Sequence, residues 1–99
     1  MSKRVFLATP DLLFRSKLAG AVGAAGGEVT RDAAACDLAV VTIEGDGAIE
    51  RIRALVQRGV SVLAHGSHVR ADLLRAARDA GAAAVPNSQV EARLRDLLK

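Results

Sequence analysis

The sequence predicts an α/β domain built around a five-stranded parallel sheet. Short runs of apolar and β-branched residues alternate with segments whose apolar residues recur every three or four positions, the spacing of a helix face. The runs "RVFLA" (4–8) and "DLAVVT" (37–42) are almost wholly apolar, as in strands covered on both faces. The chain has 99 residues, about half of them hydrophobic, which suits one globular domain spanning 1–99.

The first helix is expected to begin where the first strand ends. Thr9 is predicted to be its N-cap and Pro10 its first residue, where a missing N–H costs nothing. Asp11 then lies in the first turn, where the helix dipole favours a negative charge. The inner face is predicted to comprise Leu13, Leu18, Val22 and Ala25, with Gly26 and Gly27 ending the helix.

Four further strands and three further helices follow along the chain. The strands are predicted at 28–30, 37–42, 60–64 and 82–85. The inner faces of the helices are predicted to be Ile49, Ile52, Leu55 and Val56 in the first, Val69, Leu73, Leu74 and Ala77 in the second, and Val90, Leu94 and Leu97 in the third. Gly59 and Gly81 end the first two, and Ser88 with Glu91 has the spacing of a capping box for the third.

Only six residues, "RDAAAC" (31–36), connect the second predicted strand to the third. A parallel crossover normally takes a dozen or more residues and usually contains a helix. Six extended residues reach about 20 Å, barely more than the length of the strand along which they must return. The helix between these strands is therefore predicted to be missing or reduced to one turn.

Composition argues against several classes of function. The net charge is +3, but the arginines are interleaved with Asp and Glu, as in "IERIR" and "LLRAARDAG", which favours solvated helix faces over a nucleic-acid-binding patch. Phe6 and Phe14 are the only residues of the Phe, Tyr and Trp types. No apolar run is long enough to predict a membrane span. The single cysteine, Cys36, excludes an internal disulfide, is expected to act as a small hydrophobe and fits a cytoplasmic location.

Four segments carry a family resemblance. "VFLATPDLLFRSKLAGAVGAAGGEV", which includes the Asp-x-x-x-Arg of Asp11 and Arg15, is followed by "DLAVVT", "GVSVLAHGSH" and "AGAAAVPNSQVEARLRDLL". These segments resemble the receiver domain of bacterial two-component response regulators. The first is similar to a receiver's first strand, first helix and second strand, and the second is similar to its third strand. The remaining two are similar to its fourth strand and to its fifth strand with the last helix. The resemblance covers nearly the whole chain. It implies a flavodoxin-like three-layer sandwich with strand order 2-1-3-4-5.

The receiver's functional residues are replaced at every position to which they carry over. The acidic pair that helps a receiver to hold Mg²⁺ falls on Thr9 and Pro10, and the phosphoacceptor Asp falls on Thr42. The switch Ser or Thr falls on Ala64, and the Lys after strand five falls at Ser88 or one residue from it. Mg²⁺ requires the charge of carboxylate oxygens, and a Thr hydroxyl without a neighbouring base or metal is a poor nucleophile. The resemblance therefore implies a degenerate pseudo-receiver that is not an enzyme.

A second hypothesis concerns the carboxyl edge of the sheet, where open parallel sheets bind ligands. The polar residues expected there are Thr9, Thr42, Glu44, Asp46, His65, Ser67, Asn87 and Ser88. They favour a small-molecule or nucleotide site, although Glu44 and Asp46 would repel an anion. No metal site or cofactor is expected, because His65 and His68 lack further ligands nearby. His65 could act as a general base for Ser67 or Thr42, but the sequence shows no acidic residue at a spacing that would orient it. The alternative is a polar loop in which Ser67 or His68 caps the next helix.

The favoured hypothesis is protein–protein interaction in bacterial signal transduction, with a protein partner or with a second copy as a homodimer. A missing second helix would leave apolar side chains of the first strands bare, and a large bare patch marks an interface unless the third helix shifts to cover it. Receivers commonly dimerise through the surface formed by the fourth helix, fifth strand and fifth helix. The residues expected on that surface have mixed charges that suit symmetric pairing: Arg70, Arg75, Arg78, Asp79, Arg93 and Asp96.

Overall fold

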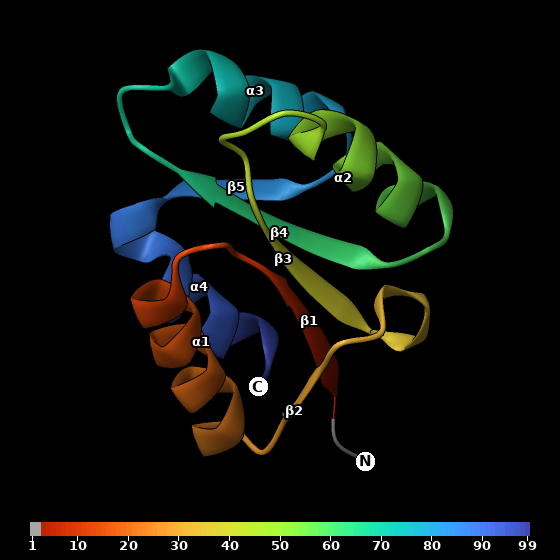
Figure 1. Ribbon diagram of the computed structural model, residues 1–99, viewed down its shortest axis with the longest axis vertical. Helices are drawn as coiled ribbons and strands as arrows, with labels where there is room; N and C mark the ends of the chain where they lie inside the picture. The colour runs from red at the N-terminus through yellow and green to blue at the C-terminus, as the bar shows by residue number, and fades with distance from the viewer. Residues whose placement is uncertain (1–2) are drawn as a thin grey trace.

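A computed structural model describes residues 3–99 and contains one parallel five-stranded sheet in the order β2-β1-β3-β4-β5, as predicted (Figure 1). The strands are β1 (Arg4–Ala8), β2 (Glu28–Thr30), β3 (Leu38–Thr42), β4 (Ser61–Gly66) and β5 (Ala83–Pro86). The helices are α1 (Leu12–Ala24), α2 (Ala48–Gln57), α3 (Ala71–Asp79) and α4 (Val90–Leu97), and two 3₁₀ turns are η1 (Ala33–Ala35) and η2 (Asn87–Gln89). The architecture is the flavodoxin-like three-layer sandwich.

The helices form two layers, one on each face of the sheet. Helices α1 and α4 cover one face, and α2 and α3 cover the other (Figure 1). The α1/α4 side buries Val5, Val40 and Leu63 with Leu18 and Leu94. Alternate residues of the same strands point to the other side, which is packed mainly with small and branched residues against α2 and α3. Both faces of the central strands are therefore covered, as their apolar runs predicted.

The predicted loss of the second helix is confirmed. Between β2 and β3 the only helical element is η1, a single three-residue turn capped by the Asp32 side chain, which accepts from the Ala34 N–H at 2.9 Å. Strand β2 is equally short and pairs only with Arg4, Val5 and Phe6 of β1. The last residues of β1, Leu7 and Ala8, therefore have no strand beside them on that edge.

The predicted start of α1 is wrong by two residues. The N-cap is Asp11, whose carboxylate accepts from the N–H groups of Leu13 at 3.0 Å and Phe14 at 3.1 Å. Thr9 is instead only 8 % exposed and points into the molecule. Leu13 is 86 % exposed rather than buried, because its five-residue spacing from Leu18 places it on another side of the helix, while Leu18 and Val22 are buried as expected. Asp11 is the cap because its carboxylate accepts from two N–H groups that have no partner within the helix, whereas the Thr9 side chain points into the molecule and is not available for capping.

The predicted caps of the last two helices are also wrong. Helix α3 begins at Ala71 after Arg70, with no side-chain cap from Ser67 or His68, and Val69 is 71 % exposed in the preceding loop. Ser88 lies within η2, and no side chain caps α4 at its N-cap residue. The capping box fails because the chain enters a 3₁₀ turn directly after β5, so that Ser88 is already inside helical backbone.

Strand β4 continues through Gly66, two residues beyond its predicted end, and so carries His65 inside the sheet. A Cβ atom at Gly66 would lie 2.5 Å from Ile43 Cγ1, so only glycine lets these two chain segments approach this closely. Within residues 3–99 no helix combines the length and the apolar character needed to cross a membrane.

Candidate functional site

Four polar side chains meet at the carboxyl edge of the sheet, each supplied by a different strand or strand end. Thr9 follows β1, Thr42 is the last residue of β3, His65 lies in β4, and Asn87 follows β5. Thr42 and His65 are directly paired across the two strands. Because the carboxyl ends of parallel strands share one edge, the topology brings together residues that are up to 78 positions apart in sequence (87 minus 9).

These side chains form one continuous hydrogen-bond network centred on the imidazole of His65. The Nδ1–H of His65 donates to Asn87 Oδ1 at 2.8 Å, and this bond leaves Nε2 as the acceptor of the neutral ring. Nε2 lies 3.2 Å from Thr9 Oγ1 and 3.1 Å from Thr42 Oγ1. Thr42 in turn donates to Thr9 Oγ1 at 3.3 Å. One consistent set of donors runs from Thr42 through Thr9 and His65 to Asn87.

The imidazole is held in an apolar setting. His65 is 2 % exposed, and its ring stacks on Phe14 of α1 with the ring centroids 5.1 Å apart. Burial lowers the pKa of His65 and outweighs the hydrogen bond to Asn87 and the negative charge of Glu44, which both act in the opposite direction. The ring is therefore neutral at physiological pH, which agrees with the acceptor role of Nε2.

The order of Thr42 hydroxyl, His65 imidazole and Asn87 amide is that of a nucleophile, a base and a residue that orients the base. Asn87 thus takes the orienting position for which the sequence showed no acidic residue. The surroundings favour a structural role. The imidazole is closed off by Phe14, and both hydroxyls are engaged with it and with each other. No buried side-chain N or O atom in the described part of the chain lacks a partner. The buried polar groups of the network are therefore satisfied within the chain.

The structure sorts the predicted edge residues into two groups. Thr9, Thr42 and His65 join the network, whereas Glu44 accepts from the backbone N–H of Ser67 at 2.8 Å and ties two loops together. Asp46 lines a cleft on the other side of Thr42. Among the described residues, no three His, Cys, Asp or Glu side chains lie close enough together to hold a metal ion.

Two receiver positions transferred from the sequence lie elsewhere. Ala64 is buried on the opposite face of the sheet, against α2 and α3, so that β4 contributes His65 to the network instead. Ser88 is exposed, and its neighbour Asn87 makes the contact, one residue from the transferred position. The stacking of Phe14 on His65 was not predicted, because helical spacing alone does not distinguish a stacking partner from a core residue.

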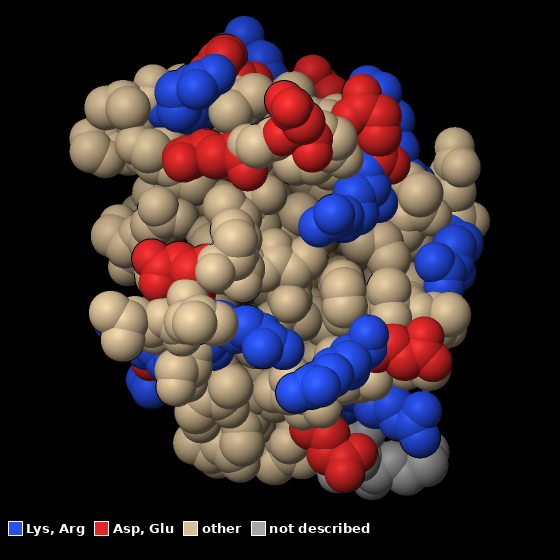
Figure 2. Space-filling model, in the orientation of Figure 1, with Lys and Arg blue, Asp and Glu red and all other residues tan. Residues whose placement is uncertain are grey.

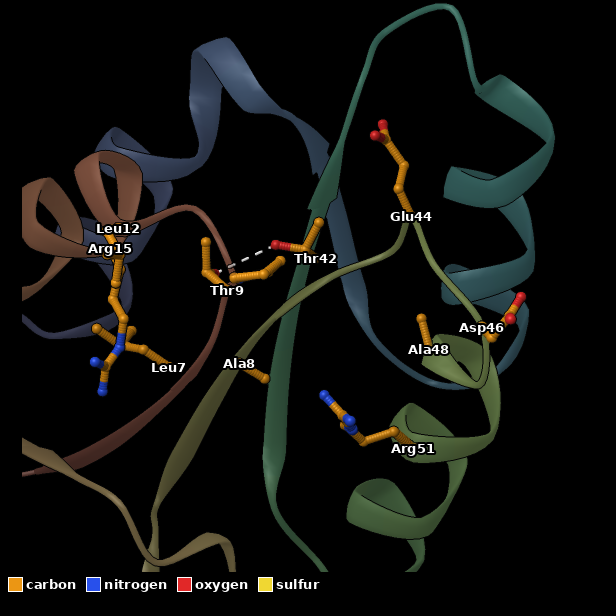
Figure 3. A pocket seen from close by; sticks show the side chains of 11 residues that line it. Leu7, Ala8, Thr9, Leu12, Arg15, Thr42, Glu44, Asp46, Ala48 and Arg51 are labelled. Atoms are coloured by element: carbon orange, nitrogen blue, oxygen red, sulfur yellow. Dashed lines mark hydrogen bonds between the residues drawn. The ribbon is translucent and has the colours of Figure 1, made fainter.

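A cleft of about 490 Å³ opens between the end of β1, the start of α1 and the start of α2 (Figure 3). Thr9 and Thr42 form its inner wall, and Arg15 and Arg51 stand at its sides. A smaller cavity of about 270 Å³ adjoins the network and is lined by Phe14, His65 and Asn87 among others. Arg51 was not singled out in the sequence, and Arg15 was named there only as part of the Asp-x-x-x-Arg resemblance, without a binding role.

The predicted interface residues are all exposed, but three of them are engaged within the chain. Arg78 donates to the backbone O of Ala84 at 2.9 Å and so covers part of the open edge of β5, while Arg70 pairs with Asp72 and Asp96 with Lys99. Among the described residues, Arg75, Asp79 and Arg93 have no side-chain hydrogen bond or ion pair of their own.

Cys36 is half-buried and packs beside the α2/α3 core, as its expected role as a small hydrophobe requires. Its Sγ donates to the Ala33 O at 3.3 Å. Burial raises the pKa of the Cys36 thiol, which keeps it protonated.

Comparison with solved structures finds the same fold in response-regulator receivers. The receiver domain of the response regulator NarL from Mycobacterium tuberculosis is 20 % identical, covers 98 % of this chain and 93 % of its own, and has a TM-score of 0.73. The orphan response regulator HP1043 of H. pylori is 16 % identical with a TM-score of 0.77, over 99 % of this chain and 98 % of its own. A pilus assembly-related protein from Burkholderia pseudomallei is 22 % identical with a TM-score of 0.75, over 97 % and 86 %.

No family model matches the chain, and no curated protein matches it. At these identities the structural matches establish the fold. The chain therefore has the fold of response-regulator receiver domains.

Proposed function

We propose that this chain is a pseudo-receiver that acts through protein–protein interaction, independently of phosphorylation. The observation that carries the proposal is the neutral network at the sheet edge. Where receivers hold Mg²⁺ and accept a phosphoryl group, Thr42, Thr9, His65 and Asn87 bond to one another and no carboxylate takes part. The network offers Mg²⁺ no carboxylate, and the nearby Asp11 and Glu44 are engaged with backbone N–H groups. Without a metal, the Thr42 hydroxyl is a poor nucleophile.

The surface supports an interaction role. The missing helix and the short β2 leave the end of β1 without a strand on one edge, and Leu12 and Val29 beside it are 78 % and 39 % exposed. The second candidate surface is formed by α3, β5 and α4, where the exposed and unengaged Arg75, Asp79 and Arg93 provide both signs of charge. We assign the contact with a second copy to the α3–β5–α4 surface, because opposite charges on one patch can pair with themselves across a two-fold axis.

Phosphorylation independence is tested by incubating the protein with acetyl phosphate and MgCl₂ and measuring its intact mass. The expected result is no phosphoryl adduct, while a phosphorylatable receiver treated in parallel gains one. A stable adduct on Thr42 or Asp11 would overturn this part of the proposal.

The interaction is tested by native mass spectrometry over a concentration series. We expect a dimer that is weakened in Arg93→Glu and retained in Arg53→Glu, since Arg53 lies on α2, away from the proposed surface, and carries the same charge. A monomer at every concentration, with no polypeptide retained through gentle purification, would contradict the interaction role.

One observation favours a second candidate function, which is the binding of a small molecule at the carboxyl edge. The cleft between α1 and α2 lies at this edge and, at about 490 Å³, falls within the usual size range of ligand pockets, roughly 300 to 1,000 Å³.

A further inference from the structure

The cleft between α1 and α2 owes its existence to the missing helix. Strand β2 stops at Thr30, and η1 replaces a helix, so the last two residues of β1 have β3 on one side and no strand on the other. Leu7, Ala8, Leu12 and Ala48 supply apolar walls for the resulting space. A molecule that entered it would meet these walls and, at the inner end, the hydroxyls of Thr9 and Thr42.

Two arginines reach this cleft from opposite layers of the sandwich. Arg15 comes from α1 and Arg51 from α2, and Figure 3 shows both side chains extending beside the end of β1. Neither guanidinium makes an ion pair or a hydrogen bond within residues 3–99. Arg15 is also half-buried, so part of its hydration is lost without compensation from a protein partner. Such a group gains most from a bound anion, with which it forms charge-assisted hydrogen bonds.

The carboxylates at the rim do not cancel these charges. Glu44 is engaged by the backbone N–H of Ser67 at 2.8 Å, and in Figure 3 Glu44 and Asp46 both extend away from Arg15 and Arg51. A third arginine, Arg31, lines an adjoining hollow of about 340 Å³ together with Arg15. In Figure 2, basic side chains border the middle of this face, and the acidic ones lie mainly in its upper part and toward its left and lower margins. The two carboxylates therefore lie at a different part of the cleft from the two guanidiniums.

We propose that this cleft binds a phosphorylated small molecule. Its phosphate is held between Arg15 and Arg51, and its organic part lies against the apolar walls at Leu12 and Ala48. A phosphate carries up to two negative charges and presents acceptor oxygens in several directions, which suits two guanidiniums that approach from different sides. The proposal rests on the second candidate function and not on the interaction role.

The test is isothermal titration calorimetry of the full chain at constant ionic strength, with pyrophosphate and adenosine monophosphate as probes. We expect both to bind the wild-type protein and Arg51→Gln to weaken the affinity about tenfold or more, since one charge-assisted pair is lost. Arg15→Gln is expected to act in the same direction. The matched control is Arg53→Gln, which removes the same charge from the exposed face of the same helix without touching the cleft and should change the affinity less than about twofold.

Arg51 is exposed, so its replacement leaves the fold intact, and this is checked by comparing ¹H–¹⁵N spectra. The same spectra of the wild-type protein should show the largest probe-induced shifts at Ala8, Leu12 and Ala48. Equal weakening in Arg51→Gln and Arg53→Gln would overturn the proposal in favour of non-specific charge attraction. Absence of binding by both probes would also overturn it, as would binding of a hexaglutamate peptide alone, which would indicate an acidic protein segment as the occupant. None of these results changes the dimer measured by native mass spectrometry, so the two proposals fail separately.

Discussion

His65 donates its Nδ1–H to Asn87 Oδ1 at 2.8 Å, and this bond links β4 to the residue that follows β5. It holds the buried imidazole in the tautomer whose Nε2 accepts from a threonine hydroxyl. A neutral network, whose buried polar groups all have partners, results at the carboxyl edge of the sheet. The network thus follows from the strand register, which brings Thr42 and His65 side by side.

Removing the partner of His65 should destabilise the protein. In Asn87→Ala the buried Nδ1–H loses its acceptor, so we expect the free energy of unfolding to fall by about 1 to 3 kcal/mol. Urea denaturation followed by far-UV circular dichroism measures this. The neighbouring Ser88→Ala should stay within about 0.5 kcal/mol of wild type, because Ser88 is exposed and caps no helix. Equal stability of the two variants would show that the bond contributes nothing.

Stability should depend on pH through His65. The pKa of His65 is lowered in the folded state, so below the ordinary value of about 6.5 the unfolded chain takes up a proton that the native state resists. Stability is therefore complete above this value and is lost as the pH falls from about 6.5 toward the lower pKa of the folded state. Denaturation at pH 7.5, 6.5 and 5.5 should show this slope in wild type and in His68→Gln. In His65→Gln the slope should flatten, and an unchanged slope there would assign it to other groups.

The cap of α1 can be identified by mutation. Asp11→Ala removes the acceptor of two backbone N–H groups and should cost about 0.5 to 2 kcal/mol of unfolding free energy. Asp11→Ser keeps a capping oxygen and should retain most of that stability. Thermal denaturation of the three proteins makes the comparison. If Asp11→Ala were as stable as wild type, the capping function would return to Thr9.

Two glycines should respond to alanine in opposite ways. At Gly66 the new Cβ would lie 2.5 Å from Ile43 Cγ1 and 2.7 Å from its Cδ1, so the variant should lose about 1 to 3 kcal/mol. At Gly20, inside α1, a Cβ meets no atom within 4 Å, and the helix should gain about 0.5 to 1 kcal/mol. Melting temperatures that move in the same direction for both variants would contradict the close approach of β4 to Ile43.

The errors in reading the sequence share a physical cause. Thr9 and Ser88 have the right residue type and spacing for caps, yet Asp11 caps α1 and Ser88 lies within η2. The same backbone donors can be satisfied by several neighbouring side chains, and the choice depends on which of them another part of the chain requires. Thr9 is required by His65, which is 56 residues away, and no local pattern contains that information.

The sequence by itself determined the order of strands and helices, the burial of both sheet faces and the loss of the second helix, because these follow from local periodicity and from the length of the link at 31–36. Only the tertiary structure decided that His65 rather than Ala64 faces the sheet edge, that Phe14 covers it, and that Arg15 and Arg51 stand at one cleft. Those relationships depend on strand register and on the rotation of each helix against the sheet. Both are set by packing between segments that are distant in the chain.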